Sequence, residues 1–281
     1  MWIIVGVALV WLAYSAFVEP HRLEVTTIRA HLPGVGPGLD GIRILHLTDL
    51  HLLRIGRNER KILALVERLR PEIIVLTGDF CSRWGVEEGV RFLELLRAPL
   101  GVFFSPGNND DRTLGVLRAK AKGVRFLVNG FAVVGRSGSR LIVAGVDDPH
   151  SGRDNLEVAL RGAPEGAPII LLAHSPDVAL REGFERVHLC LCGHTHGGQI
   201  CPLPGRPLYV HTRGRVPHSG LHRVRGAFLY VSRGVGTSVL PFRFLCPPEL
   251  VVVELRGAKG GEACVEVVSR ACACRWLREK T

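Results

Sequence analysis

Carboxylate, imidazole and amide side chains recur in short motifs along the sequence, at spacings suited to metal binding. The candidate ligands are Asp49, His51, Asp79, Asn108, His174, His194 and His196. Imidazole together with carboxylate suits Mn²⁺, Fe or Zn²⁺, and none of these side chains is a thiolate. Two such ions close together need a bridging carboxylate, for which Asp79 is the natural candidate. The chemistry implied is hydrolysis by water that two metal ions activate.

Each motif directly follows a short apolar run of the length of a strand. These runs span residues 42–47, 73–76, 102–104, 169–173 and 187–192, and a further run spans 141–146. Amphipathic stretches predict helices at 86–96 and 113–122 and another helix capped by Asn58 and ended by Pro71. Ligands gather at the carboxyl ends of strands in an open α/β sheet, so we expect the motifs to converge. The loop at 147–150 also follows a strand, but its proline indicates a turn.

Beyond residue 198 the pattern changes to strands without long helices. Apolar runs at 207–210, 227–231, 250–255 and 264–268 predict a second sheet that completes a β-sandwich. The expected fold class is therefore an α/β sandwich. We divide the chain into a membrane anchor at 1–18, a leading strand and linker at 19–41, a catalytic domain at 42–270 and an unassigned basic tail at 271–281.

The N-terminal segment is strongly apolar. Residues 1–18 carry no charged side chain and include Trp2 and Trp11 as interfacial residues. We interpret this stretch as an uncleaved anchor, with a cleaved signal peptide as the alternative. Arg22 and Arg29 follow it, so the positive-inside tendency places the domain on the cytoplasmic side of a bacterial inner membrane. The eight cysteines form no regular framework, which agrees with reduced thiols in the cytosol.

The overall composition limits the class of partner. The chain has 281 residues, of which 47% are hydrophobic, and this excludes intrinsic disorder. Its net charge of +10 comes mainly from arginine, which suits phosphate groups and anionic lipid headgroups, although a solvated basic surface needs no ligand. No basic stretch is interleaved with aromatic residues, so nucleic acid is not expected as a partner.

The ordered motifs closely resemble those of the calcineurin-like metallophosphoesterase superfamily, D-x-H, G-D, G-N-H-D/E, H and G-H-x-H. The resemblance extends over residues 42–255 and implies a four-layer α/β/β/α sandwich with two divalent metal ions, Mn²⁺ first among the three candidates. By this resemblance, the ligands of one ion are Asp49, His51, Asp79 and His196, and those of the other are Asp79, Asn108, His174 and His194. Residues 193–199, 230–234 and 241–249 are similar to the bacterial membrane-anchored phosphodiesterase branch.

One position departs from the superfamily pattern, because Asn109 stands where the family has histidine. In the family that histidine is taken to protonate the leaving oxygen, and an amide cannot act as a general acid. This loss matters least when the leaving group is a phosphate that is already stable as an anion, so Asn109 favours a pyrophosphate bond. The similar UDP-2,3-diacylglucosamine pyrophosphatases have arginine at this position. We therefore expect a membrane-associated substrate such as UDP-2,3-diacylglucosamine.

The resemblance and the motif positions also suggest catalytic residues. We assign Asn109, Asp110 and Arg243, and expect Asn109 and Arg243 to hold phosphoryl oxygens; a structural role is the alternative for Arg243. The nucleophile would be a hydroxide bound by both metals, in line with the leaving oxygen. Three other functions stay open: a phosphodiesterase for another phosphorylated small molecule, a nuclease, and a metal-binding scaffold without catalysis. The sequence does not indicate an oligomeric state.

Overall fold

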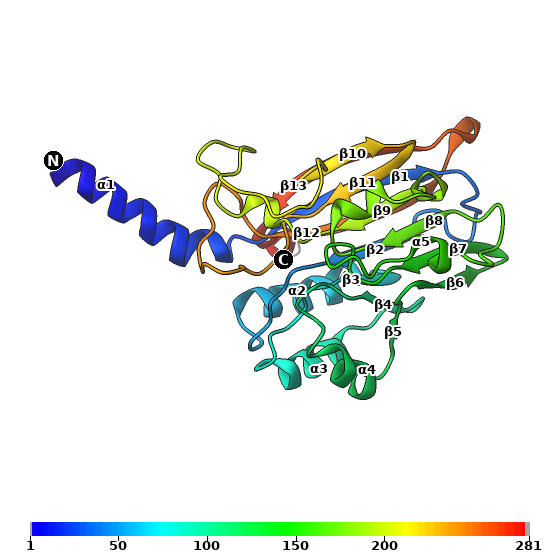
Figure 1. The fold of residues 1–281 in the computed structure, drawn as a ribbon, viewed down its shortest axis with the longest axis horizontal. Coiled ribbons are helices and arrows are strands. Elements are labelled where there is room, and N and C mark those ends of the chain that lie inside the picture. The colour runs from blue at the N-terminus through cyan, green and yellow to red at the C-terminus, as the bar shows by residue number, and fades with distance from the viewer. Residues whose placement is uncertain (1, 279–281) are drawn as a thin grey trace.

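Two β-sheets form the centre of the protein in the computed structural model, which describes residues 2–278 (Figure 1). The first sheet has the order β13-β1-β12-β2-β3-β4-β5, and the second has the order β10-β11-β9-β8-β7-β6. The strands of the first are β1 (Glu24–Leu32), β2 (Arg43–Leu47), β3 (Ile73–Thr77), β4 (Val102–Ser105), β5 (Val124–Phe126), β12 (Glu249–Gly257) and β13 (Cys264–Cys272). Those of the second are β6 (Gly130–Arg136), β7 (Ser139–Gly145), β8 (Ile169–Leu172), β9 (Leu189–Cys192), β10 (Gly220–Val224) and β11 (Ala227–Val231).

The sheets pack face to face over one apolar core. Ile44, Val75 and Phe103 of the first sheet meet Val143 and Leu191 of the second within this core. Strands β2 to β5 pair in parallel, and so do β7, β8 and β9. Parallel pairing places the carboxyl ends of neighbouring strands at the same edge of each sheet.

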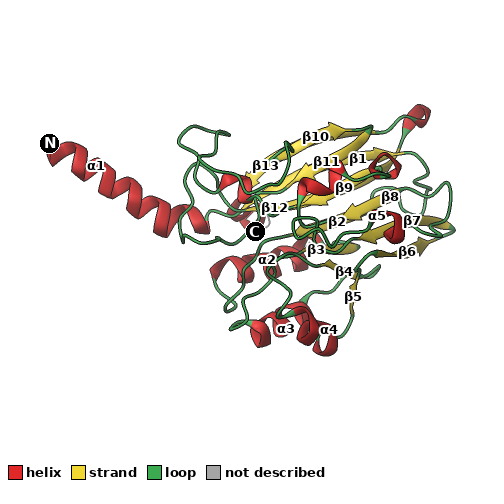
Figure 2. Ribbon diagram, viewed as in Figure 1, coloured by secondary structure: helices red, strands yellow, loops and turns green. Residues whose placement is uncertain are grey.

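Helices cover the outer faces of both sheets, which gives α/β/β/α layering (Figure 2). The first sheet is covered by α2 (Arg57–Leu69), α3 (Val86–Leu95), α4 (Leu114–Lys120) and α6 (Ala273–Arg278). The second sheet carries only the short α5 (Leu156–Ala159) and the 3₁₀ turns Pro176–Leu180 and Phe184–Arg186. Helix α2 buries apolar residues at helical spacing, and it ends where Arg70 takes the left-handed conformation before Pro71.

The first turn of α2 differs from the sequence prediction. Its N-cap is Gly56, whose amide donates to the Glu59 carboxylate over 2.9 Å. Asn58, predicted as the cap, lies inside the helix and donates to the carbonyl of Pro20 over 2.7 Å. The Asn58 side chain, which the sequence pattern predicted as a helix cap, therefore makes a tertiary hydrogen bond instead.

The chain beyond residue 198 also departs from its prediction. Its strands divide between the sheets, because β10 and β11 extend the second sheet whereas β12 and β13 join the first. The predicted strand at 207–210 is absent, and this segment is a loop. Leu208 and Tyr209 are 69% and 70% exposed, so their apolar character does not mark a buried strand. Strand β1 lies between β12 and β13, so the sheet includes residues that precede position 42.

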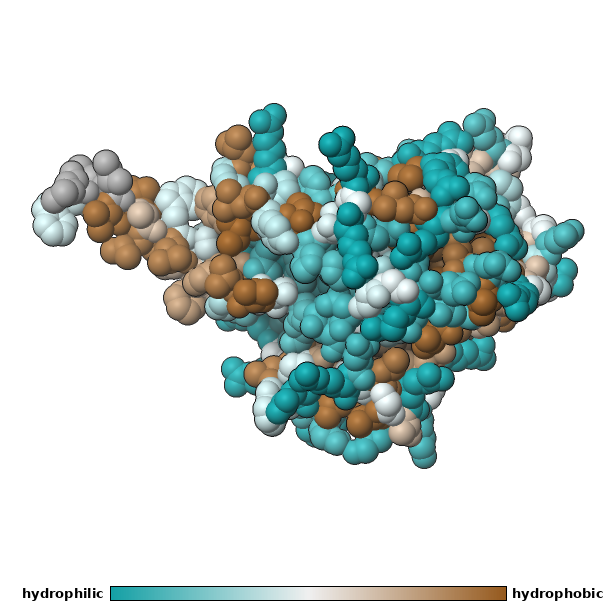
Figure 3. All heavy atoms as spheres, viewed as in Figure 1, coloured by the Kyte–Doolittle hydropathy of each residue, from teal (hydrophilic) through white to brown (hydrophobic). Residues whose placement is uncertain are grey.

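Helix α1 (Trp2–Ala13) projects from the body and continues through the π-helical turn Tyr14–Val18 (Figure 1). Apolar side chains cover it (Figure 3), and Trp2 and Phe17 are 82% and 74% exposed. At its base the ring of Trp11 lies 5.4 Å from that of Phe244. Among residues 2–278, no helix combines the length and the apolar character that crossing a membrane requires.

A buried carboxylate joins the two sheets. Glu249, the first residue of β12, accepts hydrogen bonds from the hydroxyl of Thr26 on β1 and that of Tyr230 on β11. It also accepts from the amide of Arg233 over 3.0 Å. Burial alone would raise the pKa of Glu249, but the Arg233 guanidinium and these donors hold it below its usual range. The charged form therefore contributes to the packing of the sheets.

We expect Glu249→Gln to lower the free energy of unfolding by about 1–3 kcal/mol, because it leaves a buried donor without its charged acceptor. Urea unfolding of the metal-free protein measures this loss. The matched control is Glu254→Gln on the same strand, where the carboxylate pairs with the partly exposed Arg29. That change should cost less than about 1 kcal/mol. Equal losses in the two variants would contradict the role given to Glu249.

Candidate metal centre

All seven predicted metal ligands lie on loops that leave the carboxyl ends of strands. Asp49 and His51 follow β2, Asp79 follows β3, Asn108 follows β4, His174 follows β8, and His194 and His196 follow β9. Hydrogen bonds connect these loops across the two sheets. The amide of His194 donates to both carboxylate oxygens of Asp49, over 3.1 and 2.9 Å. The amide of His51 donates to the carbonyl of Asp79 over 3.0 Å.

Six of the seven predicted ligands, all but Asn108, form two groups of three. In the first group the ligand atoms of Asp49, His51 and His196 all lie within 4.8 Å of one another, and the same holds for Asp79, His174 and His194. Ring nitrogens face each other within each group, over 3.1 Å between His51 Nε2 and His196 Nε2. The corresponding distance between His174 Nε2 and His194 Nδ1 is 3.0 Å. Such spacings suit nitrogen atoms that converge on one cation.

Asp79, a member of the second group, also faces the first group. Its Oδ2 atom is 3.7 Å from His51 Nε2, and its Oδ1 atom is 3.4 Å from His174 Nε2. One carboxylate oxygen therefore faces each group, as a bridging ligand requires.

Two buried polar atoms at the site lack a hydrogen-bond partner among the described residues. They are Asn108 Oδ1 and His194 Nε2. A buried polar atom without a partner costs free energy unless something else satisfies it. The donor set and the unpaired Asn108 oxygen fit metal binding, since a carbonyl oxygen ligates divalent cations. The nitrogen of His194 that faces His174 is Nδ1, so its unpaired Nε2 is not directed at the same point.

The electrostatics of the site favour positive charge. Burial alone would lower the pKa of His174, but the neighbouring Asp79 carboxylate and that of Asp49 raise it to about 10. Burial alone would raise the pKa of Asp79, but His174 and His51 hold it well below its usual range. Burial, with His174 and His150 beside it, lowers the pKa of His194 to about 2. The buried carboxylates thus stabilise a positive charge on His174, and the same negative charge would attract a cation.

The backbone of the site is strained. Left-handed φ angles occur at Asp49 (53°), His51 (44°), Asp79 (49°), His194 (70°) and His196 (50°). Residues other than glycine rarely adopt this conformation, and it persists only where the surrounding structure imposes it. The fold therefore imposes on these five residues a conformation that local preference would not select.

Asn109 is exposed but holds the central carboxylate. Its main-chain amide donates to Asp79 Oδ1 over 2.9 Å, and its side-chain amide donates to Asp79 Oδ2 over 2.6 Å. Asn109 also lines an open cleft of about 560 Å³, the arginine cleft, formed by residues 51, 81–83, 108–109 and 111–112. Its side chain thus borders the space where a substrate would lie.

Asp110, which the sequence suggested as a catalytic residue, lies beneath the loops of the site. It is fully buried, and its carboxylate accepts hydrogen bonds from the amides of Asp79, Phe80 and Gly107. These bonds fix the loop after β3 to the loop after β4. In the structure Asp110 therefore supports the loops that carry Asp79 and Asn108.

Arg243 was also predicted to contact phosphoryl oxygens, and the structure corrects this. Its side chain is fully buried and donates to the carbonyls of Arg233, Gly236 and Cys246. Its Nη2 atom lies 3.3 Å from His196 Nδ1, behind the first ligand group. The Arg243 guanidinium thus holds the loop at residues 233–236 beside His196. This is the structural role that the sequence analysis gave as the alternative.

Two further histidines lie beside the second ligand group. The ring centroid of His150 is 4.5 Å from that of His194, and the centroid of His211 is 5.5 Å from His194. His150 lies beyond the carboxyl end of β7, which is the position that also identified the candidate ligands. Its loop is indeed a turn, in which Asp148 accepts from the amides of His150 and Ser151. No local pattern marked His211, which lies on an irregular loop.

Comparisons with known proteins agree with this site. Residues 42–198 match the family model described as calcineurin-like phosphoesterase. The uncharacterized metallophosphoesterase YkuE of Bacillus subtilis is 33% identical over 257 residues, which cover 86% of this chain and 89% of the relative. Phosphodiesterase YaeI of Escherichia coli is 29% identical, with 86% and 92% covered. UDP-2,3-diacylglucosamine pyrophosphatase LpxG of Chlamydia trachomatis is 29% identical, with 89% and 94% covered. The resemblance inferred from the motifs is therefore confirmed.

Close packing at Gly107 gives a test of the ligand geometry. A Cβ atom at this position would lie 2.5 Å from Asp79 Oδ1 and 2.7 Å from the Asp79 amide. We expect Gly107→Ala to displace Asp79 and to weaken Mn²⁺ binding by about 10–100-fold, as mutations that disturb the support of metal ligands do. Calorimetric titration of Mn²⁺ into the metal-free protein measures the change.

Gly115 on α4 provides the matched control, because a Cβ atom there would meet nothing within 4 Å. Gly115→Ala should leave Mn²⁺ affinity unchanged. If Gly107→Ala binds Mn²⁺ as tightly as the control, the placement of Asp79 as a ligand is wrong.

Proposed function

Because the chain belongs to the calcineurin-like phosphoesterase family, we propose that it hydrolyses a pyrophosphate bond in a membrane-associated, nucleotide-linked lipid. Membership of the family makes it a hydrolase of phosphoester bonds that binds two divalent metal ions. The observation that carries the proposal is the pair of adjacent ligand groups, in which Asp79 of one group also faces His51 of the other.

We assign every predicted ligand to one of two ions. One ion takes Asp49, His51, Asp79 and His196, and the other takes Asp79, Asn108, His174 and His194. Nitrogen and oxygen donors without thiolate support Mn²⁺, with Fe and Zn²⁺ as alternatives. When bound, the two ions supply Lewis-acid polarisation of the phosphoryl group and lower the pKa of the attacking water.

The chain's own residues orient the reacting groups. Asn109 holds both carboxylate oxygens of Asp79, and Asp110 fixes the loop beneath them. Arg83 and Arg112 lie exposed in the arginine cleft, and neither makes a hydrogen bond or an ion pair with another of residues 2–278. The Arg83 guanidinium lies over the ring of Trp84, 4.1 Å from its centroid, which leaves its N–H groups unpaired. Guanidinium groups bind phosphoryl oxygens well, so we assign Arg83 and Arg112 to the phosphate groups of the substrate.

The choice of bond rests on the leaving group. Asn109 cannot donate a proton as a general acid, which favours a leaving group that departs as a stable anion. A phosphate monoester is such a group, and an alkoxide is not. The similarity to LpxG, named for hydrolysis of UDP-2,3-diacylglucosamine, supports a substrate of this kind. The equal identity to phosphodiesterase YaeI supports the second candidate, a phosphodiesterase with another substrate.

The surface supports a location at the membrane. Helix α1 exposes apolar side chains along its length, and the neighbouring loop adds Val239 and Leu240, which are 100% and 49% exposed. The amide of Arg243 on that loop donates to the carbonyl of Ser15, so the loop and the helix base are held together. We propose that these elements hold the domain on the cytoplasmic face of a bacterial inner membrane, because a contiguous exposed apolar surface is typical of a membrane-interaction site.

Removal of the central carboxylate tests the metal mechanism. We expect Asp79→Ala to lower kcat/KM by at least about 10³-fold with Mn²⁺, because it removes a ligand of both ions. Hydrolysis of UDP-2,3-diacylglucosamine and of bis(p-nitrophenyl) phosphate measures the effect. The control is Asp111→Ala in the same cleft, where the carboxylate pairs only with Arg153 among the described residues. Full activity of Asp79→Ala would exclude the two-metal assignment.

Substitution of Asn109 tests the choice of bond. Asn109→Ala should slow all substrates alike, because it removes a bond to Asp79. Asn109→His restores a general acid, which should raise kcat/KM for an alkyl phosphodiester by about 10²-fold over the alanine variant. The pyrophosphate substrate should gain far less. If histidine improves both substrates by the same factor, the leaving-group argument fails.

A further inference from the structure

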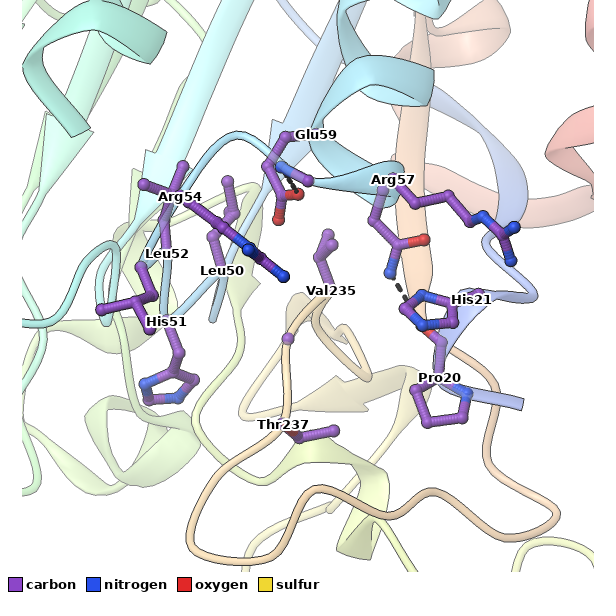
Figure 4. A pocket seen from close by; sticks show the side chains of 14 residues that line it. Pro20, His21, Leu50, His51, Leu52, Arg54, Arg57, Glu59, Val235 and Thr237 are labelled. Atoms are coloured by element: carbon purple, nitrogen blue, oxygen red, sulfur yellow. Dashed lines mark hydrogen bonds between the residues drawn. The ribbon is translucent and has the colours of Figure 1, made fainter. Parts of the chain in front are cut away.

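An open cavity of about 460 Å³ lies between the metal centre and the base of helix α1 (Figure 4). We call it the α2 cavity; it is lined by residues 20–21, 50–54, 56–59 and 235–237. His51 borders both this cavity and the arginine cleft, so the two spaces meet at a ligand of the metal centre. Pro20 and His21 border its opposite side and follow directly after the apolar N-terminal helix. The cavity therefore connects the site of hydrolysis with the region where a membrane would lie.

Two arginines give the α2 cavity its positive charge. Figure 4 shows Arg54 reaching across the cavity and Arg57 at its rim beside His21. Neither guanidinium makes a hydrogen bond or an ion pair within residues 2–278, and both side chains are exposed. Burial and the positive charges of Arg57 and Lys61 lower the pKa of His21.

The one acidic residue in the lining, Glu59, already accepts from the Gly56 amide over 2.9 Å. It is held at the start of α2 and does not pair with either arginine. The guanidinium groups are therefore free to bind an anion.

Two buried atoms at the α2 cavity add a second requirement. His21 Nδ1 and Asn58 Oδ1 have no hydrogen-bond partner among the described residues. Asn58 is only 9% exposed, and its amide nitrogen is already used in the bond to Pro20. The Asn58 oxygen needs a donor, and a fully ionised phosphate monoester carries none. A hydroxyl group can.

We propose that the α2 cavity binds the lipid-side headgroup of the substrate, a sugar or polyol that carries a phosphate. Arg54 binds the phosphate oxygens, Arg57 beside His21 donates to an oxygen of the sugar or polyol, and Asn58 Oδ1 accepts from a hydroxyl group. The lipid chains then leave the cavity past Pro20 and His21 toward the apolar surface of α1. This inference rests on the proposed function, because it places the lipid monophosphate half of the hydrolysed molecule.

Kinetics of the double variant Arg54→Ala/Arg57→Ala test the proposal. Loss of two charge-assisted contacts should raise KM for UDP-2,3-diacylglucosamine by roughly 30-fold or more, with a smaller change in kcat. Bis(p-nitrophenyl) phosphate has no second phosphate and no hydroxyl group, so its KM should rise far less. Arg60→Ala is the control, since Arg60 lies on the same helix but does not line the cavity. A similar rise in KM for both substrates would overturn the proposal.

A binding measurement separates this inference from the proposed function. The protein used is Asp79→Ala, in which the metal centre is disabled, and the probes are glucosamine 1-phosphate, inorganic phosphate and 2,3-diacylglucosamine 1-phosphate in phosphatidylcholine vesicles. We expect glucosamine 1-phosphate to bind more tightly than inorganic phosphate, and the vesicle-borne lipid most tightly. Adding Arg54→Ala/Arg57→Ala should weaken binding of glucosamine 1-phosphate at least tenfold.

The two proposals can fail separately. If the wild-type enzyme leaves the UDP-lipid intact but the arginine variants lose affinity for glucosamine 1-phosphate, the proposed function is wrong and the cavity assignment stands. If the affinity does not depend on Arg54 and Arg57, the cavity assignment is wrong whatever the enzyme hydrolyses.

Discussion

The burial of two carboxylates, Asp49 and Asp79, where the sheets meet is the constraint on which the rest of the site depends. Uncompensated charges in such a position cost several kcal/mol each, so the surroundings must supply positive charge and hydrogen-bond donors. The amides of His194 and Asn109 donate to these carboxylates, and Asp110 holds the loops that present them. The remaining demand for positive charge is one that a pair of cations would meet.

The convergence of the candidate ligands could be predicted because a single rule applied to each of them: polar residues that follow buried strands come together at one edge. The burial of Arg243 and Asp110 could not be predicted, because it depends on tertiary packing, which motif position does not contain. The role of Asn58 could not be predicted for a related reason, since a contact with Pro20 replaced its local capping role. The division of the late strands between two sheets was also unpredictable, because pairing partners far apart in the sequence decide it.

The position of the site relative to helix α1 suggests how a membrane-associated substrate would lie in it. The arginine cleft and the α2 cavity meet at His51, and the cavity opens toward the base of the apolar helix. A substrate with a phosphorylated head and apolar chains can extend along this path, with its reacting phosphate at the metal centre. Asn109 stands where the family has a histidine that acts as a general acid. In this protein its side-chain amide instead donates a hydrogen bond to the Asp79 carboxylate, which faces both ligand groups.

The central claim is that the two ligand groups bind a pair of metal ions. Anomalous diffraction from crystals soaked in MnCl₂, recorded at the manganese edge, tests it most directly. We expect two anomalous-difference peaks with Asp79 between them. One peak should lie beside Asp49, His51 and His196, and the other beside His174 and His194. A single peak, or none, would contradict it.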